Sequence, residues 1–540
     1  MKRKFSTIKP FRRVVIKKGG VAGFFRVMSP LAVGSVSFAR TKYIIHFLTM
    51  GHAYSMTVEV HCLPVKRQKW SRDFGEWFRD VLINAEIMDY RYPIKGSGVW
   101  MPYGFKIRRN TLNILRYLLD TTGHDETLFP LLIPETSLAQ EAEHVKSFEG
   151  ECFWVTRGGY EPLKVKYALR PTSETVIAPM LKLWIRSHAD LPKKLYQVVN
   201  VFRHETKATR PIIRMREVEP FKEAHTCHAT GEEAEQQVQQ AVEIYRMFFD
   251  LIGVPYVVSR RPDWDKFAGA LYTIAFDLLC PDGRALQIGT VHNLGQNFAK
   301  AFDIKYETED GSQQYIWTTS YGISGRGIAA ALIAHGDDNG VVLPPIIAPI
   351  HVVVVPVPYK GKAEEVNEAC KKVADMLCKR FRVELDSREN LSPGNKFYYW
   401  ELRGVPIRVE IGPRDVENGE VTVVRRDTLK KQTCKMEEAA AAVQKLAEEM
   451  TCDLQANALT WMKEHVYRVD SLSEAKTLLK RKAGIVEVPW CGGDDCGHRL
   501  EEAVEARLLG FPEDKKEAVE GSCLICGKHA TNVVRVALAY

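Results

Sequence analysis

The pattern of expected strands and helices changes at Ile350, and this change constrains the fold more strongly than any other feature of the chain. Between residues 150 and 345, strand-like runs are separated by turns and by one acidic helix at 231–251, which is typical of an α+β domain. After a proline-rich hinge at 344–349, strands and helices alternate at short intervals, which indicates a compact α/β domain with a parallel or mixed sheet. The sequence therefore predicts at least two domains of different architecture.

The spacing of apolar residues places the individual elements. It predicts a buried helix face within 71–90 and a long helix that ends near Gly123. An apolar strand expected at 127–133 is broken by Pro130, which suits a sheet edge or an interface. Beyond the hinge we expect strands at 351–356, 381–386, 405–411 and 420–425, and helices at 361–380, 394–403 and 436–450. A helical stretch and a cysteine-bearing tail follow, so we place domains at 59–345, 346–450 and 451–540.

The net charge of +8 comes from the first residues of the chain. Residues 1–58 contain eleven Lys or Arg and neither Asp nor Glu, which leaves 64 basic and 67 acidic residues in the remainder. Any nucleic-acid partner must therefore be bound by local patches. We expect this basic leader to be disordered or not native, with Met56 as the true start; an organellar transit peptide is the alternative. Scattered cysteines favour a reducing, cytoplasmic location, and the apolar runs are too short for a membrane span.

Four cysteines near the end of the chain have the spacing of a zinc site. Cys491 and Cys496 are separated from Cys523 and Cys526 by 26 residues, and glycines beside each pair allow tight turns. Four thiolates complete a tetrahedral Zn²⁺ site, so we expect this one to stabilise the tail rather than to perform chemistry. Unrelated reduced cysteines or disulfides are the alternatives, and His498 is a candidate substitute ligand.

Several short segments combine hydroxyl, carboxylate and guanidinium groups. Residues 169–174 read Leu-Arg-Pro-Thr-Ser-Glu, and 203–217 add further arginines. A carboxylate accepts from an ammonium group, while guanidinium groups bind phosphate oxygens two at a time. Residues 287–297 are rich in polar side chains. Residues 321–333 form a glycine-bearing turn followed by an apolar helix, with Arg326 at the start of that helix. Each segment alone has an ordinary structural explanation, but together they predict a site for a small amine beside a polyphosphate.

With these motifs in this order, residues 60–540 resemble class II aminoacyl-tRNA synthetases, and among them the prolyl-tRNA synthetases of the archaeal and eukaryotic cytosolic type. Residues 123–134, 202–221 and 321–333 look like the three class motifs, although Gly325 stands where the wider class often has an acidic residue. The resemblance implies an α+β catalytic domain with an antiparallel sheet, an α/β anticodon-binding domain and a small α+β zinc-bearing C-terminal domain. It also implies a homodimer.

The resemblance further implies an activity and a role for each site residue. The activity is ATP-dependent activation of L-proline to prolyl-adenylate and transfer to tRNA(Pro), with release of AMP and pyrophosphate. Arg203 and Arg326 are the implied catalytic residues, and Tyr540 is expected to lie towards the active site. The implied proline ligands are Thr172, Glu174, Arg203, His292, Phe221 and Phe267. The implied ATP ligands are Glu205, Arg214, Gln287, Thr290 and Ser324 with both catalytic arginines, and Mg²⁺ would bridge phosphate oxygens. The candidates for anticodon contact are Arg388, Lys396, Glu401, Arg414 and Asp415.

Two other functions compete with this interpretation. A threonyl enzyme of the same class should bind a catalytic zinc within its catalytic domain, whereas the cysteines here lie in the tail. A catalytically dead tRNA-binding paralogue should have lost Glu174, Arg203 or Arg326, and all three are present. The bacterial branch of the family inserts an editing domain between the second and third motifs. Residues 217–287 hold little beyond one acidic helix, so any correction of mischarged alanine must come from elsewhere.

Overall fold

The computed structural model describes residues 67–138, 149–359, 361–514, 519 and 521–540, together with four strands nearer the N-terminus. The chain divides into two compact units, Met1–Val65 and Lys66–Tyr540. In the first, the four strands pair antiparallel in chain order: β1 (Val14–Lys18), β2 (Val21–Val27), β3 (Thr41–Thr49) and β4 (His52–Val60). The basic leader expected at 1–58 falls in this unit, and its disordered or non-native character stays a prediction.

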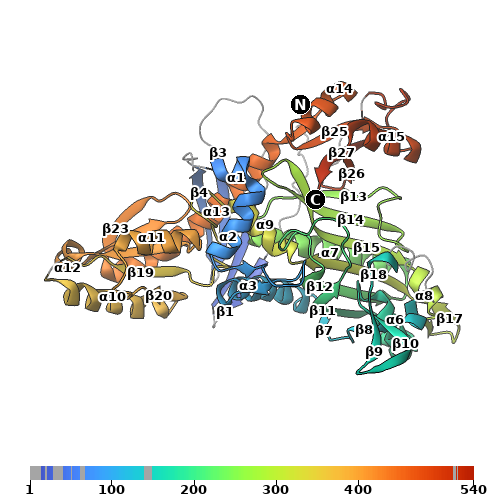
Figure 1. The fold of residues 1–540 in the computed structure, drawn as a ribbon, viewed down its shortest axis with the longest axis horizontal. Helices are drawn as coiled ribbons and strands as arrows, with labels where there is room; N and C mark the ends of the chain where they lie inside the picture. The colour runs from blue at the N-terminus through green and yellow to red at the C-terminus, as the bar shows by residue number, and fades with distance from the viewer. Residues whose placement is uncertain are drawn as a thin grey trace, which may run out of the picture. The chain divides into compact units, whose positions relative to one another are not determined.

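The centre of the second unit is an antiparallel sheet (Figure 1). Its strand order is β13 (Val257–Arg260), β14 (Tyr272–Leu279), β15 (Arg284–Gly295), β18 (Trp317–Ser324), β12 (Glu217–His228) and β11 (Lys193–Phe202). A short edge strand, β7 (Asp125–Glu126), pairs parallel with β11. The prediction of an antiparallel catalytic sheet is confirmed.

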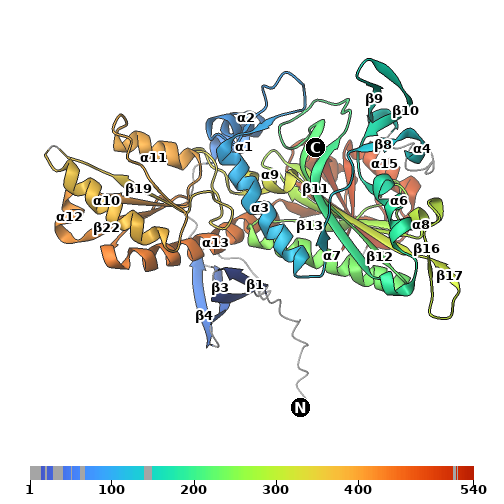
Figure 2. The ribbon, with the colours of Figure 1, turned by 90° about the horizontal axis from the view of Figure 1, so that it is seen from below.

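Helices cover one face of this sheet (Figure 2). They are α3 (Pro102–Asp120), α7 (Gly231–Leu251) and α9 (Arg326–His335). Helix α7 repeats buried side chains at helical spacing, among them Val238, Tyr245 and Phe248, and the Thr230 hydroxyl caps its first turn. Helix α9 is buried on nearly all sides, so its apolar sequence 328–334 is required by its position in the core.

The N-terminal part of this unit confirms one prediction and corrects another. The buried helix face expected within 71–90 belongs to α2 (Phe74–Asn84), which a short helix, α1 (Gln68–Arg72), precedes. The strand expected at 127–133 is wrong in its bounds, because only its last residues are in a strand, as part of β8 (Leu132–Pro134), and β7 ends before it at Glu126. Pro130 has no N–H to donate, and the guanidinium of Arg170, from a distant segment of the chain, donates to the carbonyl oxygens of Phe129 and Pro130 at 2.8 and 3.3 Å.

Shorter elements surround the central sheet. Strand β8 joins β10 (Glu161–Leu169) and β9 (Phe153–Gly158) in a separate three-stranded sheet. The remaining short elements are α4 (Glu135–Leu138), α6 (Glu174–Trp184), α8 (Asn297–Ala301), β5 (Met88–Asp89), β6 (Val99–Trp100), β16 (Lys305–Glu307) and β17 (Gln313–Tyr315).

The domain beyond the hinge is a mixed sheet flanked by helices, as predicted. Its order is β20 (Val383–Leu385), β19 (Val352–Pro356), β21 (Ile407–Ile411), β22 (Glu420–Arg425) and β23 (Lys431–Lys435), with the first three parallel. The helices are α10 (Ala363–Cys378), α11 (Pro393–Leu402), α12 (Pro413–Asn418) and α13 (Ala439–Glu464). Helix α13 runs through residue 450, where the sequence suggested a boundary.

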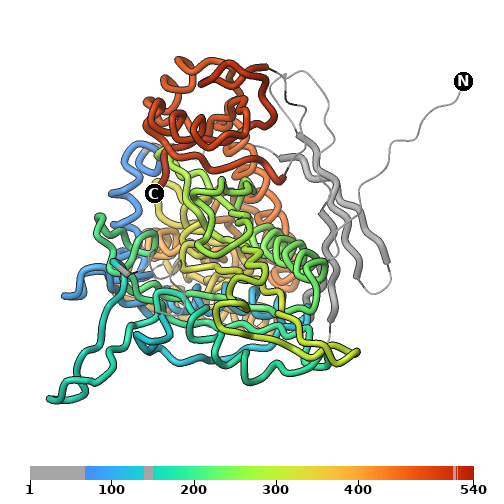
Figure 3. Tube along the Cα trace, turned by 90° about the vertical axis from the view of Figure 1, so that its right-hand side faces the viewer, coloured from blue at the N-terminus to red at the C-terminus, as the bar shows by residue number. Residues whose placement is uncertain are grey.

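The C-terminal strands extend the catalytic sheet, which the sequence did not indicate. Strand β26 (Arg507–Pro512) pairs with β13, and β27 (Asn532–Ala539), β25 (Ile485–Trp490) and β24 (Val466–Arg468) follow, giving eleven strands in one sheet. In Figure 3 the red C-terminal strands lie against the green strands of the catalytic domain. Helices α14 (Leu472–Lys480) and α15 (Asp494–Val504) complete this domain. Within the described residues, every helix is too short or too polar to cross a membrane.

Candidate active site

The face of the sheet opposite α7 carries the predicted site residues in register. Residues paired directly across β12, β18 and β15 form rows on this face, and one row consists of Glu223, Gly322 and Thr290. The neighbouring row consists of His225, Ser320 and His292 and continues to Thr273 on β14. Residues directly opposite one another on neighbouring strands share a face, so antiparallel pairing brings these distant segments onto one polar surface.

Glu174 forms the negatively charged end of this surface. It is the first residue of α6 and is 5% exposed. One carboxylate oxygen accepts from the Thr172 hydroxyl at 2.5 Å, the other accepts from the Ser320 hydroxyl at 2.9 Å, and His225 Nδ1 lies 3.9 Å from Glu174 Oε1. A carboxylate held by two hydroxyls beside an open polar face is suited to bind a small cation.

A second buried carboxylate, Glu223, lies beside the first, and sequence reasoning missed it. It accepts from the Ser173 hydroxyl and from the Gln197 amide, the latter at 2.9 Å. Its other oxygen lies 3.6 Å from His225 Nε2. Burial lowers the pKa of His225, but the neighbouring carboxylates of Glu223 and Glu174 outweigh burial and raise it. The alternation of Glu223 and His225 along β12 was the sequence signal that could have placed both on the site face.

An aromatic wall adjoins His292. The rings of Phe267 and His292 lie 4.7 Å apart between centroids, and the Thr273 hydroxyl contacts both the Phe267 N–H and His292 Nδ1, at 2.9 and 2.8 Å. On the other side, Phe221 lies below the Arg203 guanidinium at 5.8 Å. Of the rings predicted to enclose a pyrrolidine, Phe221 belongs to β12, and Phe267 lies in the loop before β14, where Thr273 holds its main chain.

Arginines form the positively charged end. Burial lowers the pKa of Arg203, and the carboxylates of Glu151, Glu223, Glu174 and Glu205 act against that shift. The pKa of Arg326 is lowered to about 10, first by burial and then by the positive charges of Arg203 and Arg214. Arg203 also contacts the main chain of Pro171, next to the Thr172 whose hydroxyl donates to Glu174, and the charge of Arg203 acts on Arg326, so the structure places the three predicted residues in one region.

The arginine side chains are held in place by main-chain carbonyl groups. Arg203 Nε donates to Pro171 O at 3.1 Å, and Arg326 Nε donates to Ile213 O at 2.7 Å. Arg326 Nη1 also donates to the main-chain oxygen of Gln287 at 3.3 Å. These contacts fix the two guanidinium groups in place before any ligand arrives.

The remaining predicted nucleotide ligands lie around these arginines. Arg214 Nε is 3.2 Å from Glu205 Oε2 in the loop between β11 and β12. The Ser324 hydroxyl accepts from the Arg326 N–H at 3.2 Å. Thr290 lies on the site face of β15, and the exposed Gln287 precedes it on the same strand.

The chain's end also reaches this region, as expected. The Tyr540 hydroxyl donates to Asp282 at 2.7 Å, and the guanidinium of Arg210, from the loop between β11 and β12, lies 4.9 Å from the tyrosine ring centroid.

Comparison with known proteins identifies this arrangement. Models for the "tRNA synthetase class II core domain (G, H, P, S and T)", the "Anticodon binding domain" and "Prolyl-tRNA synthetase, C-terminal" match residues 153–335, 351–446 and 472–540. A proline–tRNA ligase of Metallosphaera sedula is 54% identical over 482 residues, covering 88% of this chain and all of the relative. The chain belongs to the prolyl-tRNA synthetase family. A family member from Pyrococcus horikoshii is 51% identical over 480 residues, with the same coverage.

A solved family structure agrees with the fold described above. Giardia lamblia prolyl-tRNA synthetase in complex with prolyl-adenylate superimposes with a TM-score of 0.84 at 36% identity, covering 88% of this chain and 99% of that one. The threonyl alternative thereby loses its support, because the relatives and the C-terminal family model both specify proline.

All four tail cysteines lie within the part matched by the prolyl-tRNA synthetase C-terminal model. Their sulfur atoms gather within 4.8 Å of one another, and those of Cys491 and Cys526 are 3.7 Å apart. Tetrahedral bonds of about 2.3 Å would place sulfur atoms about 3.8 Å apart, so the residues fit a zinc ion.

The candidates for anticodon contact differ in their burial and in whether their charged groups already contact other residues of the protein. Lys396 is 4% exposed and donates to Asp386 O at 3.0 Å, so its ammonium is a structural contact. Arg388 pairs with Asp386 at 2.6 Å, and Asp415 accepts from the Gly412 N–H at the start of α12. Arg414 is exposed.

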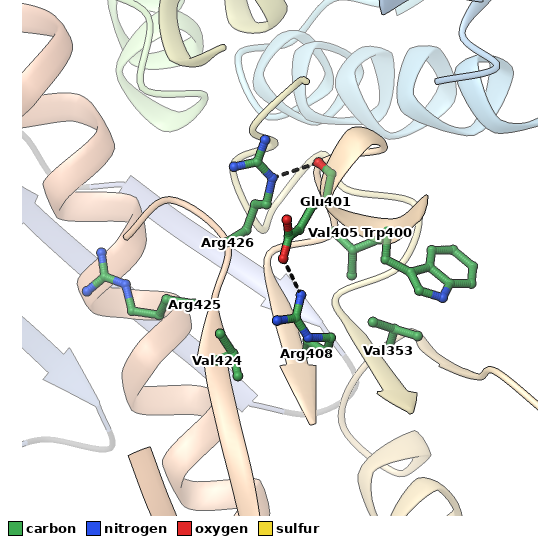
Figure 4. A pocket seen from close by; sticks show the side chains of 8 residues that line it. All are labelled: Val353, Trp400, Glu401, Val405, Arg408, Val424, Arg425 and Arg426. Atoms are coloured by element: carbon green, nitrogen blue, oxygen red, sulfur yellow. Dashed lines mark hydrogen bonds and ion pairs between the residues drawn. The ribbon is translucent and has the colours of Figure 1, made fainter. Parts of the chain in front are cut away.

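Glu401 lines a small pocket in the same domain (Figure 4). Its charged side chains are committed to ion pairs: Arg408 to Glu401 at 2.7 Å, and Arg426 to Asp337 at 2.6 Å. The pocket lies within the anticodon-binding domain, and these ion pairs occupy its charged groups. Its lining residues are Val353, Trp400, Glu401, Val405, Arg408, Val424, Arg425 and Arg426.

Proposed function

We propose that this chain activates L-proline with ATP and transfers it to tRNA(Pro), releasing AMP and pyrophosphate. The observation that supports this most is the meeting of Glu174, Arg203 and Arg326 at one polar face, with negative charge at one end and guanidinium groups at the other. A zwitterionic amino acid and a nucleotide triphosphate are complementary to that charge distribution.

At the negative end, Glu174 and Thr172 bind the secondary ammonium of proline, with His292 beside them. Phe221 and Phe267 enclose the ring. The buried carboxylate of Glu174 gains a cationic partner when proline binds, which offsets the cost of its burial. Selectivity follows, because a primary amine without the ring leaves the aromatic wall unfilled.

At the positive end, Arg203 bridges the proline carboxylate and the α-phosphate, and Arg326 binds the γ-phosphate. Glu205, Arg214, Gln287, Thr290 and Ser324 bind the rest of the nucleotide. A proline carboxylate oxygen attacks the α-phosphorus, a phosphorus–oxygen bond breaks, and pyrophosphate leaves. The carboxylate is already the nucleophile, so the residues act by positioning and by neutralising developing charge. In the second step the terminal ribose hydroxyl of the tRNA attacks the prolyl carbonyl, and AMP leaves.

Two metal ions belong to this proposal. Mg²⁺ takes most of its ligands from phosphate oxygens and water, so it needs few protein groups, and the Glu205 carboxylate lies among the arginines. Zn²⁺ would be held by Cys491, Cys496, Cys523 and Cys526, and would stabilise the C-terminal domain without taking part in the reaction.

We also infer a homodimer in the cytoplasm. An apolar patch on β8, α6 and the preceding loop is exposed to solvent, with Leu128 80%, Leu183 57% and Trp184 42% exposed. Contiguous exposed apolar side chains mark interaction surfaces, and a second copy of the chain is the occupant proposed here. Sedimentation should show Trp184→Glu as a monomer while Tyr359→Glu, a change at a more exposed aromatic of the anticodon domain, stays dimeric. A monomeric wild-type protein would refute the assignment.

The decisive experiment is ATP–pyrophosphate exchange on the purified chain. Proline, alanine, cysteine and threonine are compared in parallel, and exchange should depend on proline and disappear in Arg203→Ala. Threonine-dependent exchange would point to another enzyme of the class. Binding of tRNA without exchange would point to an inactive paralogue.

A further inference from the structure

Arg261 links the C-terminal domain to the proposed ATP site. It follows β13 directly and is 6% exposed as a residue. Its Nη1 donates to the main-chain oxygen of Leu509 in β26 at 2.6 Å. Its Nη2 donates to Asp277 Oδ1 at 2.8 Å and to Gln287 Oε1 at 2.9 Å. One buried guanidinium therefore joins three strands, one of which belongs to the C-terminal domain.

This contact fixes the orientation of the Gln287 amide. A guanidinium group can only donate hydrogen bonds, so the amide atom that faces Arg261 must be the oxygen. The NH₂ group of Gln287 is then the end left to donate to a ligand, which suits phosphate or ribose oxygens. The main-chain oxygen of the same residue accepts from Arg326 at 3.3 Å. Gln287 therefore contacts Arg261 through its side chain and Arg326 through its main chain.

We propose that Arg261 is a positioning residue for the ATP site, and that the C-terminal domain sets its place through the Leu509 carbonyl. The proposal rests on the proposed function, because it takes Gln287 to bind the nucleotide. Strand pairing between β13 and β26, with Arg260 opposite Phe511, holds Leu509 in reach of Arg261 (Figure 1). The buried carboxylate of Asp277, 1% exposed, fixes the guanidinium from the other side.

The neighbouring Arg260 provides a matched control. It also joins the two domains, because its Nε lies 2.6 Å from Glu513 Oε1, but its guanidinium lies over the Tyr272 ring at 4.2 Å and on the other face of the strand from Arg261. A change at Arg260 therefore weakens the contact between domains without releasing Gln287.

The experiment compares Arg261→Lys with Arg260→Lys by ATP–pyrophosphate exchange. Lysine keeps the charge beside Asp277, but one ammonium cannot reproduce the planar fork that spans Leu509, Asp277 and Gln287. We expect the KM for ATP to rise about tenfold in Arg261→Lys, the size of one lost hydrogen bond to a charged group, with the KM for proline unchanged. Arg260→Lys should match the wild type in both constants. An unchanged KM for ATP in Arg261→Lys, or an equal rise in both variants, overturns the proposal.

Two further variants separate positioning from folding. Arg261→Gln/Asp277→Asn removes both charges of the buried pair together, so no unpaired carboxylate remains, and it should still raise the KM for ATP. In a Gln287→Ala background, Arg261→Lys should add no further rise, because its effect passes through that amide. An additive effect overturns the proposal. A wild-type chain without proline-dependent exchange would instead refute the proposed function, which is a separate result.

Discussion

Replacing Glu174 by glutamine tests the charge at the proline end of the site with little change of shape. The carboxylate is 5% exposed and accepts from the hydroxyls of Thr172 and Ser320. A glutamine amide can accept from one hydroxyl and donate to the other, because hydroxyl groups do both. The local packing should therefore survive, and the free energy of unfolding should change by less than about 1 kcal/mol.

The effect on activity should be much larger than the effect on stability. A hydrogen bond between charged partners contributes about 1.5–3 kcal/mol, and Glu174→Gln removes the charge on the protein's side of that contact. We therefore expect kcat/KM for proline to fall about 10- to 150-fold. The ATP end of the site lies with the arginines, so the KM for ATP should change little.

The assay is ATP–pyrophosphate exchange at varied proline, with urea unfolding of the same samples. Glu410→Gln serves as the control, because Glu410 is also a buried carboxylate, 7% exposed, but pairs with Arg408 in the anticodon-binding domain. That variant should lose stability and keep its KM for proline. The reasoning fails if Glu174→Gln retains the wild-type kcat/KM, or if its loss of activity is matched by a loss of folded protein.

Three other predictions concern stability, metal and tRNA. Burial, followed by the charge of Arg67, lowers the pKa of His335 to about 3, whereas an unfolded histidine titrates near pH 6.5. The stability this group contributes is therefore complete above pH 6.5 and is lost as the pH falls towards 3, and His335→Gln should flatten the slope near pH 5 by about 1.4 kcal/mol per pH unit in urea titrations. Cys523→Ser should remove about one bound zinc ion per chain by elemental analysis and lower the melting temperature, and unchanged zinc content would exclude the proposed site. Arg414→Ala should raise the KM for tRNA in aminoacylation without altering ATP–pyrophosphate exchange, whereas Lys396→Ala should chiefly destabilise its domain, because that side chain is buried.

Those parts of the site that depend on local sequence were predictable. Glu174 and Arg326 each begin a helix, and Arg203 directly follows a strand, so their short motifs fix both the conformation and the direction of the side chain. Glu223 and His225 were missed because their importance depends on which face of β12 points to the site, and only pairing with β18 decides that. The strand expected at 127–133 failed for a similar reason, since Arg170, a residue from another segment, takes the carbonyl groups that a strand would have paired.

The junction between the catalytic and C-terminal domains is a part of the fold that sequence patterns did not predict. The pairing of β26 with β13 was not predicted, because the two strands lie more than two hundred residues apart and their register depends on the assembled fold. That pairing makes the C-terminal domain part of the catalytic sheet. A small C-terminal domain could be only a stabilising addition, yet here its strands continue the catalytic sheet, and the Leu509 carbonyl accepts from the same Arg261 guanidinium that contacts Gln287. Because a sheet transmits displacement through its hydrogen-bonded strands, losing order in the tail should disturb the nucleotide end of the site, where Arg261 contacts Gln287, before the proline end, where Glu174 begins α6 and is bonded to Thr172 and Ser320.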